Sequence, residues 1–396
     1  MRIAILGYTA TSYGSYTYLK NFLPHLAQFD RDNTYEVFLP AGQAGDLAIK
    51  QSNFHWHVGR VAPRSGWLRV LWEQLVLPWI LWFKHVDAVY TTHNVAIFLS
   101  PVPSLILVQN VEPFFTGKFP SAPRLRPRLL LLRLLSHLSL HRSLRIIAIS
   151  DWEREFLVEH LRVPSDKIAV ACPGVTAGFR PPARESASLL REYLALTPPY
   201  MLCVTRLAGY GNLLRLVKAY TLLVKQNKTS IPLVIPGEVW DERYVGTIRQ
   251  VLEQERCADL VRFLGYVPHR DMPLLIGNAT CFVFPSLLEA FGHALLEALA
   301  CGAPVLCCQR RPMSDICRDA AVYFDGEDPA DIAAKLLTVL ADPALRERLA
   351  RKGVMRAAEF SWDTGATTVH KALTELSRFP RSSNRKHDTI SSERSV

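Results

Sequence analysis

The sequence predicts an α/β protein of two lobes, each a doubly wound parallel sheet with helices on both faces. Short apolar runs alternate with helical stretches along nearly the whole chain, which is the pattern of parallel sheets. A proline-containing stretch near residue 180 interrupts this alternation, which then begins again. The length of 396 residues is sufficient for two domains of ordinary size. We therefore expect two lobes that face a central cleft, where a large polar ligand would touch both.

The first lobe is expected to begin with a strand at residues 2–8, a loop of small residues at 9–15 that contains Gly14, and a helix at 16–28. This unit can accept an anion at the helix start, although it lacks a GxGxxG fingerprint. Ser150, with acidic residues in the turn after it, predicts the start of another helix. The other strands of this lobe are predicted at residues 35–39, 54–57, 88–90, 104–108, 145–149 and 167–171.

The second lobe repeats the alternation. Its strands are predicted at residues 200–204, 232–235, 261–264, 282–284 and 321–324, with another directly after Pro304. Its helices are predicted at residues 212–226, 242–255, 270–276, 292–300, 329–340 and 343–359. The predicted boundaries are an N-terminal lobe at 1–180, a linker at 181–195, a C-terminal lobe at 196–360, a C-terminal helix at 361–378 that packs back towards the first lobe, and a polar, disordered tail at 379–396.

The sequence shows no recognisable export signal, and this together with its cysteine usage favours a cytoplasmic protein that is not exported. Met1 and Arg2 lead directly into an apolar strand and not into the apolar core of a signal peptide. The longest apolar stretch, residues 70–83, is interrupted by Glu73 and Pro78 and is too short to span a bilayer. The eight cysteines form no CxxC pair, which favours buried, reduced thiols over disulfides or zinc ligands.

Much of the net charge of +10 lies in one leucine-rich segment, residues 124–145. The arginines of this segment are Arg124, Arg126, Arg128, Arg133, Arg142 and Arg145, and four tryptophans lie upstream, at Trp67, Trp72, Trp79 and Trp82. Such a basic, leucine-rich helix is typical of proteins that lie on anionic lipid, at the inner face of the plasma membrane for a cytoplasmic protein. A core helix with a solvated arginine edge explains the same residues. Nucleic acid is not an expected partner, because no recognised binding module is present.

The stretch at residues 282–306, FVFPSLLEAFGHALLEALACGAPVL, carries the strongest functional signal. An apolar strand ends at Pro285, and the following loop contains Glu289 at the edge where open α/β sheets bind ligands. Gly292 begins a helix, so the amide groups of residues 291–294 face the same crevice and form an anion site. Glu297 lies on this apolar helix, and a buried carboxylate needs a partner. Spacing alone leaves open a simpler explanation, in which Glu289 is solvated and Glu297 pairs with a structural arginine.

Further motifs occur in a characteristic order. They are YMLCVTRLAGYGNLLRLVKAY, LVIPGE, VRFLGYV, the stretch with Glu289 and Glu297 as an E-x7-E element, DAAVYFDGED and RAAEFSW. Together they resemble the retaining glycosyltransferases of family four (glycosyl transferases group 1). The resemblance is strong over about residues 165–376 and looser in the first lobe, through MRIAILGY, the Gly14 loop, WEQLVLP and IAISDWEREFL. It implies the GT-B architecture of two Rossmann-like lobes.

The resemblance implies a nucleotide-diphosphate sugar as donor and assigns roles to particular residues. Glu289 would orient the transferred sugar, Glu297 would bind the ribose, and Arg206 would pair with the diphosphate. The donor-binding set is completed by the start of the helix, at Phe291, Gly292, His293 and Ala294, and by loop residues Gly237, Gly265 and Val267. Gly14 and His93 are candidates for the acceptor side. The resemblance implies neither a protein nucleophile nor a cofactor or metal, and we read the single DxD triplet, Asp30 to Asp32, as a solvated turn.

The sequence departs from the family pattern at some positions. Relatives carry a lysine directly before the asparagine that follows Arg206, where this chain has Gly211, and Lys218 is an uncertain substitute. One cation fewer at a desolvated phosphate site costs roughly 1.5–3 kcal/mol of transition-state stabilisation. Gln109 and Asn110 stand where many relatives have a histidine on the acceptor side, a role that His93 can take.

The leading functional hypothesis is transfer of a hexose, of mannose or glucose type, from a GDP or UDP sugar to a lipid-linked or cell-surface polysaccharide such as lipopolysaccharide. The alternative is a catalytically weak homologue that binds a sugar nucleotide or a partner, and Gly211 is the residue that motivates it. A sugar-nucleotide epimerase on the same two-lobed fold is a third hypothesis, which requires no acceptor.

Overall fold

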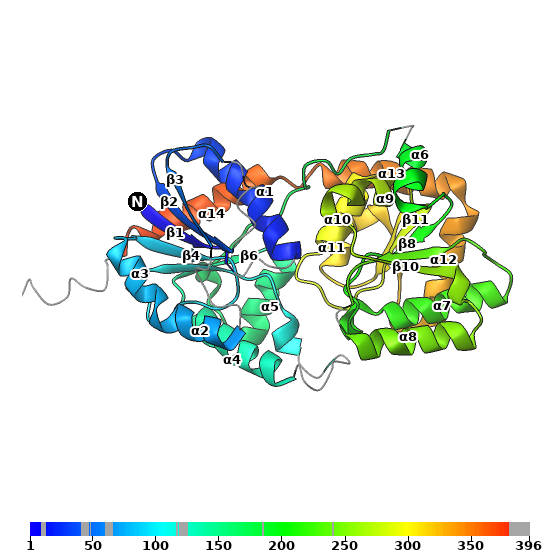
Figure 1. Ribbon diagram of the computed structural model, residues 1–396, viewed down its shortest axis with the longest axis horizontal. Coiled ribbons are helices and arrows are strands. Elements are labelled where there is room, and N and C mark those ends of the chain that lie inside the picture. The colour runs from blue at the N-terminus through cyan, green and yellow to red at the C-terminus, as the bar shows by residue number, and fades with distance from the viewer. Residues whose placement is uncertain are drawn as a thin grey trace, which may run out of the picture. The chain divides into compact units, whose positions relative to one another are not determined.

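The computed structural model describes residues 1–8, 13–40, 47, 49–59, 66–115, 118, 126–183, 186–239 and 241–379. The chain forms two compact units (Figure 1). The first unit comprises Met1–Asn110, Leu131–Gly174 and the segment from Ser361 onwards, and the second comprises Val111–Leu130 and Val175–Phe360. Each unit contains one parallel sheet, so the predicted α/β class with two sheets is confirmed. The predicted domain boundaries at 180, 195 and 360 stay predictions.

The sheet of the first unit has the strand order β3-β2-β1-β4-β5-β6-β7. Its strands are β1 (Arg2–Leu6), β2 (Thr34–Pro40), β3 (Phe54–Gly59), β4 (Ala88–Thr91), β5 (Ser104–Leu107), β6 (Arg145–Ala148) and β7 (Ile168–Val170). All neighbouring strands pair in parallel. The apolar side chains of the central strands β1, β4, β5 and β6 are almost completely buried, as in strands covered on both faces. The strand order reverses between β1 and β4, which is the topological switch point of this sheet.

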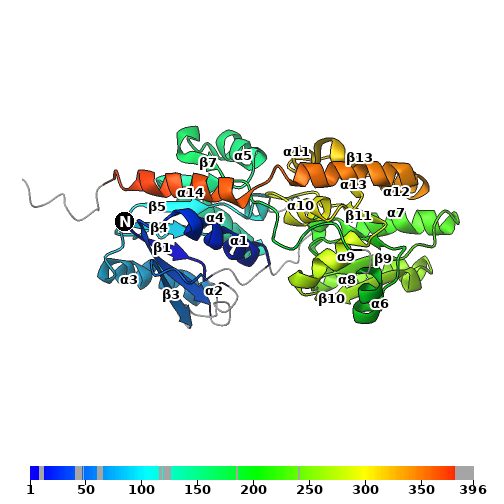
Figure 2. The same ribbon diagram turned by 90° about the horizontal axis from the view of Figure 1, so that it is seen from above.

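Helices cover both faces of this sheet. They are α1 (Tyr13–Phe29), α2 (Gly66–Leu75), α3 (Leu77–Phe83), α4 (Arg126–Arg142), α5 (Asp151–Leu161) and α14 (Trp362–Leu376). Helix α5 begins as predicted, because Ser150 Oγ accepts a hydrogen bond from the Glu153 amide and the Glu153 carboxylate accepts one from the Ile149 amide. The last helix of the described residues, α14, runs beside α1 across the sheet of this unit (Figure 2). Among the described helices, none is long and apolar enough to cross a membrane.

The sheet of the second unit has the order β10-β9-β8-β11-β12-β13. Its strands are β8 (Met201–Leu202), β9 (Leu233–Pro236), β10 (Val261–Gly265), β11 (Cys281–Phe284), β12 (Val305–Cys308) and β13 (Ala321–Phe324). Its helices are α6 (Ser186–Leu194), α7 (Leu213–Lys225), α8 (Glu242–Gln254), α9 (Met272–Gly277), α10 (His293–Ala300), α11 (Met313–Cys317), α12 (Pro329–Ala341) and α13 (Pro343–Ala357). The switch point of this sheet lies between β8 and β11.

Three local predictions differ from the structure. Part of the predicted linker is helical, because α6 buries Leu190 completely and packs against α9. Helix α1 already begins at Tyr13, within the predicted loop, while residues 9–12 lie outside the described residues. Asp30 of the DxD triplet is buried and not solvated, since its carboxylate accepts hydrogen bonds from the Asn33 side chain and the Tyr35 hydroxyl. The predicted tail from residue 380 onwards also lies outside the described residues.

Candidate functional site

Two loops meet at the switch point of the second unit. One follows β8 and spans residues 205–212, and the other follows β11 and spans residues 286–292. The Leu287 amide donates a 2.8 Å hydrogen bond to the Tyr210 carbonyl, and Ser286 Oγ lies 3.4 Å from the same oxygen. Open α/β sheets bind ligands at this position, beyond the carboxyl ends of the strands. The two loops therefore form the base of a candidate ligand site.

Asn212 ties these loops to a third one. Its side-chain amide donates hydrogen bonds to the carbonyl oxygens of Pro285 (3.1 Å) and Gly326 (2.7 Å), and Arg215 donates one to its side-chain oxygen (3.0 Å). Asn212 has a φ of 58°, in the left-handed region that asparagine tolerates better than most residues. The asparagine after Gly211 is thus a structural centre of the site, a role that the sequence motif did not reveal.

Glu289 and Arg206 lie together at this switch point. Burial raises the pKa of Glu289 to about 7, while a hydrogen bond from Ser286 and the positive charge of Arg206 act in the opposite direction. The Arg206 guanidinium also acts on Tyr210, whose pKa is raised mainly by burial. An exposed arginine therefore stands beside a half-buried carboxyl group that changes its charge near neutral pH.

Glu112 is a second carboxylate of this cluster, and sequence reasoning missed it. It lies in a short 3-10 helix, Glu112–Phe115, which belongs to the second unit by its contacts although it follows β5 in sequence. Burial raises the pKa of Glu112, and Arg206 and Arg128 counteract this effect. Its position just after a strand of the first lobe was the available sequence signal, but only the fold shows that it approaches Arg206.

Helix α10 begins beside Glu289, as predicted. Gly292 precedes it with a φ of 107°, a conformation that favours glycine, and the Leu295 and Leu296 amides donate the first helical hydrogen bonds to the Gly292 carbonyl. The amides of residues 291–294 therefore lie ahead of the helical ladder, at the positive end of the helix dipole. His293 packs edge-on against Phe291, and burial together with the charge of His269 lowers the pKa of His293 to about 4. His293 is thus a neutral imidazole at physiological pH.

Glu297 is buried and has partners that the sequence did not suggest. His269 Nε2 lies 2.8 Å from Glu297 Oε1, and Thr176 Oγ1 donates a 3.3 Å hydrogen bond to the same oxygen. The predicted alternative of a structural arginine partner is therefore wrong, because a histidine occupies that place. His269 packs against Phe179 at a ring distance of 5.0 Å. The sequence signalled the two partners of Glu297 only as polar residues, His269 after β10 and Thr176 after β7.

The loops after β9 and β10 are joined as well. The Gly237 amide donates a 2.7 Å hydrogen bond to the Gly265 carbonyl, and both glycines have positive φ values, 134° and 68°. Val267 is buried and Tyr266 is exposed, and the chain reaches His269 two residues after Val267. The structure therefore places the glycines after β9 and β10 at the same sheet edge as the His269–Glu297 pair.

Gly211 is required by the backbone around it. A Cβ atom at this position would overlap the carbonyl oxygen of Arg206 and would lie 2.8 Å from Thr205 Oγ1. The loop as folded cannot accommodate the lysine of the family pattern. Lys218 lies on α7 and is exposed, and Arg215 of the same helix is closer in sequence to the loop and is already bonded to Asn212.

The acceptor-side candidates lie in the first unit, near its own switch point. Gly14 lies in the first turn of α1, and a Cβ there would meet nothing within 4 Å. His93 follows β4 and packs edge-on against Tyr8, with Nε2 3.7 Å from Glu73 Oε2. Both ring nitrogens of His93 are buried without a hydrogen-bond partner within the described residues. His93 thus belongs to a buried polar cluster in this structure.

Gln109 and Asn110 are positioned by Asn94. Its side-chain oxygen accepts hydrogen bonds from both of their amides, and its nitrogen donates one to the Asn110 carbonyl. The Gln109 side-chain oxygen accepts a 2.9 Å hydrogen bond from Ser15, near the start of α1. The loops after β4 and β5 are thereby tied to α1 at the edge where the switch point of the first unit lies.

Comparison with known proteins finds two matching family models. The family model of Glycosyl transferases group 1 matches residues 190–355, and that of Glycosyltransferase Family 4 matches residues 14–178. O-antigen chain mannosyltransferase B of Escherichia coli is 31% identical over 241 residues, which cover 59% of this chain and 62% of that protein. The serotype-specific mannosyltransferase WbdA of Escherichia coli is 26% identical over 240 residues, which cover 60% of this chain and 29% of that protein. The chain thus spans less than two thirds of the length of these relatives.

Solved structures share the fold over nearly the whole chain. HepE of Anabaena in complex with UDP-glucose has a TM-score of 0.75 at 16% identity and covers 95% of this chain and 100% of its own. WaaG, a glycosyltransferase involved in lipopolysaccharide biosynthesis, has a TM-score of 0.72 at 15% identity and covers 94% and 99%. These likenesses confirm the predicted GT-B fold class. With two family models matched in sequence order and two parallel α/β sheets, the chain belongs to the glycosyl transferases of group 1.

Proposed function

We propose that the protein transfers a hexose, of mannose or glucose type, from a nucleotide-diphosphate sugar to a lipid-linked or cell-surface polysaccharide. The observation that carries this proposal is the grouping of Glu289, Arg206 and the start of α10 at one switch point. Carboxylate, guanidinium and helix amides are the groups needed to hold sugar hydroxyls and a diphosphate in one site. The mannosyltransferases of Escherichia coli at 31% and 26% identity support mannose as the first sugar to test.

In this proposal Glu289 accepts hydrogen bonds from the hydroxyls of the transferred sugar, and Glu297 accepts them from the ribose. His269 and Thr176 hold the Glu297 carboxylate in place before the donor arrives. The base is expected to lie against the loop at residues 265–267, where Tyr266 offers an exposed ring.

Cleavage of the glycosyl–phosphate bond places negative charge on the departing diphosphate and positive character on the sugar. In this proposal Arg206 and the amide groups at residues 291–294 stabilise the diphosphate as that charge develops, which is electrostatic catalysis. We propose retention of anomeric configuration, with no protein nucleophile and no metal. Proton NMR of the first-formed product tests retention. Turnover in EDTA tests the second point, and we expect it to be unchanged because no metal takes part.

A panel of donors tests the proposed activity. GDP-mannose, UDP-glucose and ADP-glucose are offered with a lipid-linked oligosaccharide acceptor, and release of nucleoside diphosphate is measured. We expect one donor to be turned over, GDP-mannose first. Binding of a sugar nucleotide without transfer or hydrolysis of any donor would favour the alternative, a homologue that binds sugar nucleotides or a partner with little turnover.

We also propose that the first unit docks on the inner face of the plasma membrane, where lipid-linked acceptors lie. Exposed apolar side chains recur along α2 at Leu68, Leu71 and Leu75, along α3 at Trp79, Trp82 and Phe83, and along α4 at Leu134 and Leu138. Arg133 and Arg142 are exposed on α4, which has no acidic residue. Trp72 instead packs against the core, and Arg124 and the Trp67 side chain lie outside the described residues. Apolar anchors with a basic helix are typical of binding to anionic lipid.

Vesicle sedimentation tests this docking. Wild-type protein is expected to pellet with phosphatidylglycerol vesicles at low salt, and the double variant Trp79→Ser/Trp82→Ser is expected to remain in the supernatant. Leu189→Ser, which removes a similarly exposed apolar side chain from α6, is the matched control and should pellet like wild type. Indifference of the wild type to these vesicles would contradict the proposal.

A further inference from the structure

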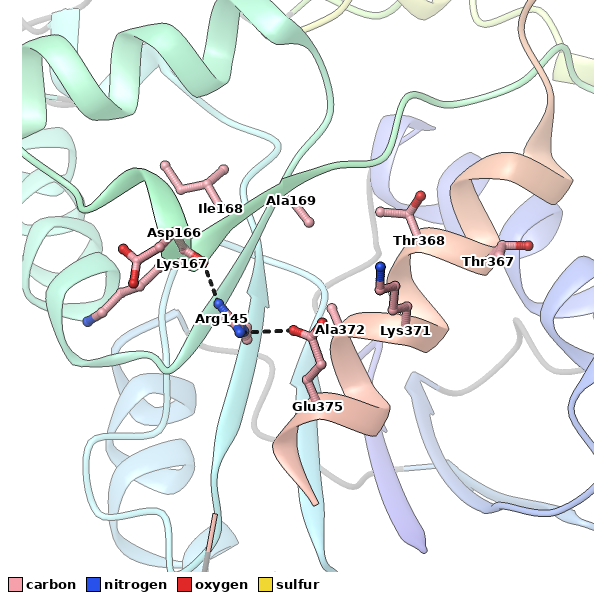
Figure 3. A pocket seen from close by; sticks show the side chains of 10 residues that line it. All are labelled: Arg145, Asp166, Lys167, Ile168, Ala169, Thr367, Thr368, Lys371, Ala372 and Glu375. Atoms are coloured by element: carbon pink, nitrogen blue, oxygen red, sulfur yellow. Dashed lines mark hydrogen bonds and ion pairs between the residues drawn. The ribbon is translucent and has the colours of Figure 1, made fainter. Parts of the chain in front are cut away.

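A pocket of about 390 Å³ lies within the first unit, apart from its switch point (Figure 3). Arg145 and Ile168 are the first residues of β6 and β7, so the pocket lies at the amino ends of these strands. Ligand sites of such sheets lie at the opposite, carboxyl ends. Its volume is within the range of roughly 300–1,000 Å³ that small-molecule sites occupy. The lining residues are Arg145, Asp166, Lys167, Ile168, Ala169, Thr367, Thr368, Lys371, Ala372 and Glu375.

Some hydrogen-bond donors that line the pocket have no partner within the described residues. Arg145 donates to the Asp166 carbonyl and pairs with Glu375 at 3.0 Å, while its Nε has no hydrogen-bond partner within the described residues. The Lys371 ammonium, on the α14 wall, makes no hydrogen bond or ion pair with any described residue. Arg145 and Lys371 thus line the pocket from β6 and α14, and of these two only Arg145 pairs with a carboxylate. The third cation of the lining, Lys167, donates to the His141 carbonyl.

The remaining lining suits a ligand that carries hydroxyl groups. The hydroxyls of Thr367 and Thr368 donate to carbonyl oxygens of their own helix at 2.8 Å and 3.0 Å, so their oxygens remain able to accept. Ile168, Ala169 and Ala372 supply an apolar wall. Asp166 lies at the far end of the pocket from Lys371 in Figure 3, so its negative charge is separated from the unpaired ammonium.

We infer that this pocket binds a small phosphate ester of a polyol, with the phosphate between Lys371 and Arg145 and the hydroxyls towards Thr367 and Thr368. Lysine supplies a point charge for phosphate and arginine a planar set of donors, and charged hydrogen bonds of this kind are the strong ones. The site lies in the other unit from Glu289 and Glu297, so it goes beyond the proposed donor chemistry.

The pocket also adjoins the segments by which the chain leaves and re-enters the first unit. The chain leaves after Gly174, shortly beyond β7, and returns at Ser361, directly before α14. These segments touch closely, because a Cβ at Gly174 would overlap the Trp362 amide and a Cβ at Gly365 would lie 2.9 Å from the Cys172 carbonyl oxygen. A ligand that links β6 and β7 to α14 would stabilise this packing, so binding should raise the melting temperature.

Thermal unfolding with glucose 6-phosphate as probe tests the inference, at constant ionic strength set with sodium chloride. The parent protein carries Arg206→Ala, which weakens phosphate binding at the donor site, and all variants are compared within this background. We expect glucose 6-phosphate to raise Tm in this protein, with an apparent affinity that falls about tenfold or more on adding Lys371→Gln, since one charged hydrogen bond is lost. Lys371→Arg should restore the shift. Lys20→Gln, which removes an exposed lysine from α1 of the same unit, should leave it unchanged.

The result that would overturn the inference is a Tm that does not respond to glucose 6-phosphate, or a response that is the same with and without Lys371. Phosphorus NMR line-broadening of the probe gives the same comparison without reference to stability. Since the parent protein carries Arg206→Ala, the outcome is independent of whether the protein transfers sugar.

Discussion

At the residue scale, Glu289 and Glu297 differ in their surroundings although the sequence presents them as a pair. Glu289 lies in a loop next to Arg206, with its pKa raised to about 7 by burial. Glu297 lies on a buried helix and is held by His269 and Thr176. The spacing of the two carboxylates was readable from the sequence, but His269, Thr176 and Glu112 were not, because they come from loops that only the sheet topology brings to this edge.

Replacement of Glu289 should act on turnover. We expect Glu289→Gln to lower kcat by on the order of 100-fold or more with little change in KM, because the interaction is with the sugar as it reacts. Steady-state kinetics with the preferred donor is the measurement. Unchanged kcat would show that Glu289 is a structural residue of the loop.

Glu289 should also make stability depend on pH. Its carboxyl pKa is raised from 4.5 to about 7 by burial, so the folded state binds the proton more tightly than the unfolded state. The resulting stabilisation is fully present below pH 4.5 and is lost as the pH rises through 7, with a maximum of about 3 kcal/mol. Urea unfolding of wild type and Glu289→Gln at pH 5 and pH 8 measures this. The wild type should lose more stability across this interval, and identical losses would contradict the pKa assignment.

At the element scale, the loop between β8 and α7 is set by close backbone approach at Gly211. The sequence indicated a missing lysine there, and the structure shows the cause, since any side chain would meet the Arg206 carbonyl. Helices α5 and α10 were predictable because their starting residues, Ser150 and Gly292, carry recognisable signals. Helix α6 was missed because Pro181 and Pro182, just before it, gave the stretch the composition of a linker, although Leu190 anchors the helix.

Gly211→Ala should therefore destabilise the second unit by about 1–3 kcal/mol, the cost of overpacking a well-filled site. It should weaken donor binding as well, because Arg206 is in the same loop. Gly246→Ala is the matched control, because Gly246 lies inside α8 and a Cβ there meets nothing within 4 Å. We expect that control to stabilise the protein by about 0.5–1 kcal/mol, through helix propensity. Equal effects of both changes on urea unfolding would show that Gly211 is not constrained.

At the scale of the whole molecule, the alternation of strands and helices was sufficient to predict two parallel sheets. When the strands of each sheet are counted in chain order, both sheets contain the order 3-2-1-4-5-6, which reverses between the first and fourth strands. The contacts of Val111–Leu130 were not predictable, since this segment belongs to the second unit while its neighbours in sequence belong to the first. Sequence proximity gives no sign of such an exchange, because it depends on tertiary contacts.

The most direct test of the donor site is calorimetric binding of GDP and UDP to wild type, Glu297→Gln and Glu289→Gln. The account predicts that wild type binds one of these nucleotides, that Glu297→Gln binds it about tenfold or more weakly through loss of a charged ribose contact, and that Glu289→Gln binds it like wild type. Weaker binding by Glu289→Gln with unchanged binding by Glu297→Gln would contradict the assignment of ribose to Glu297 and of the sugar to Glu289.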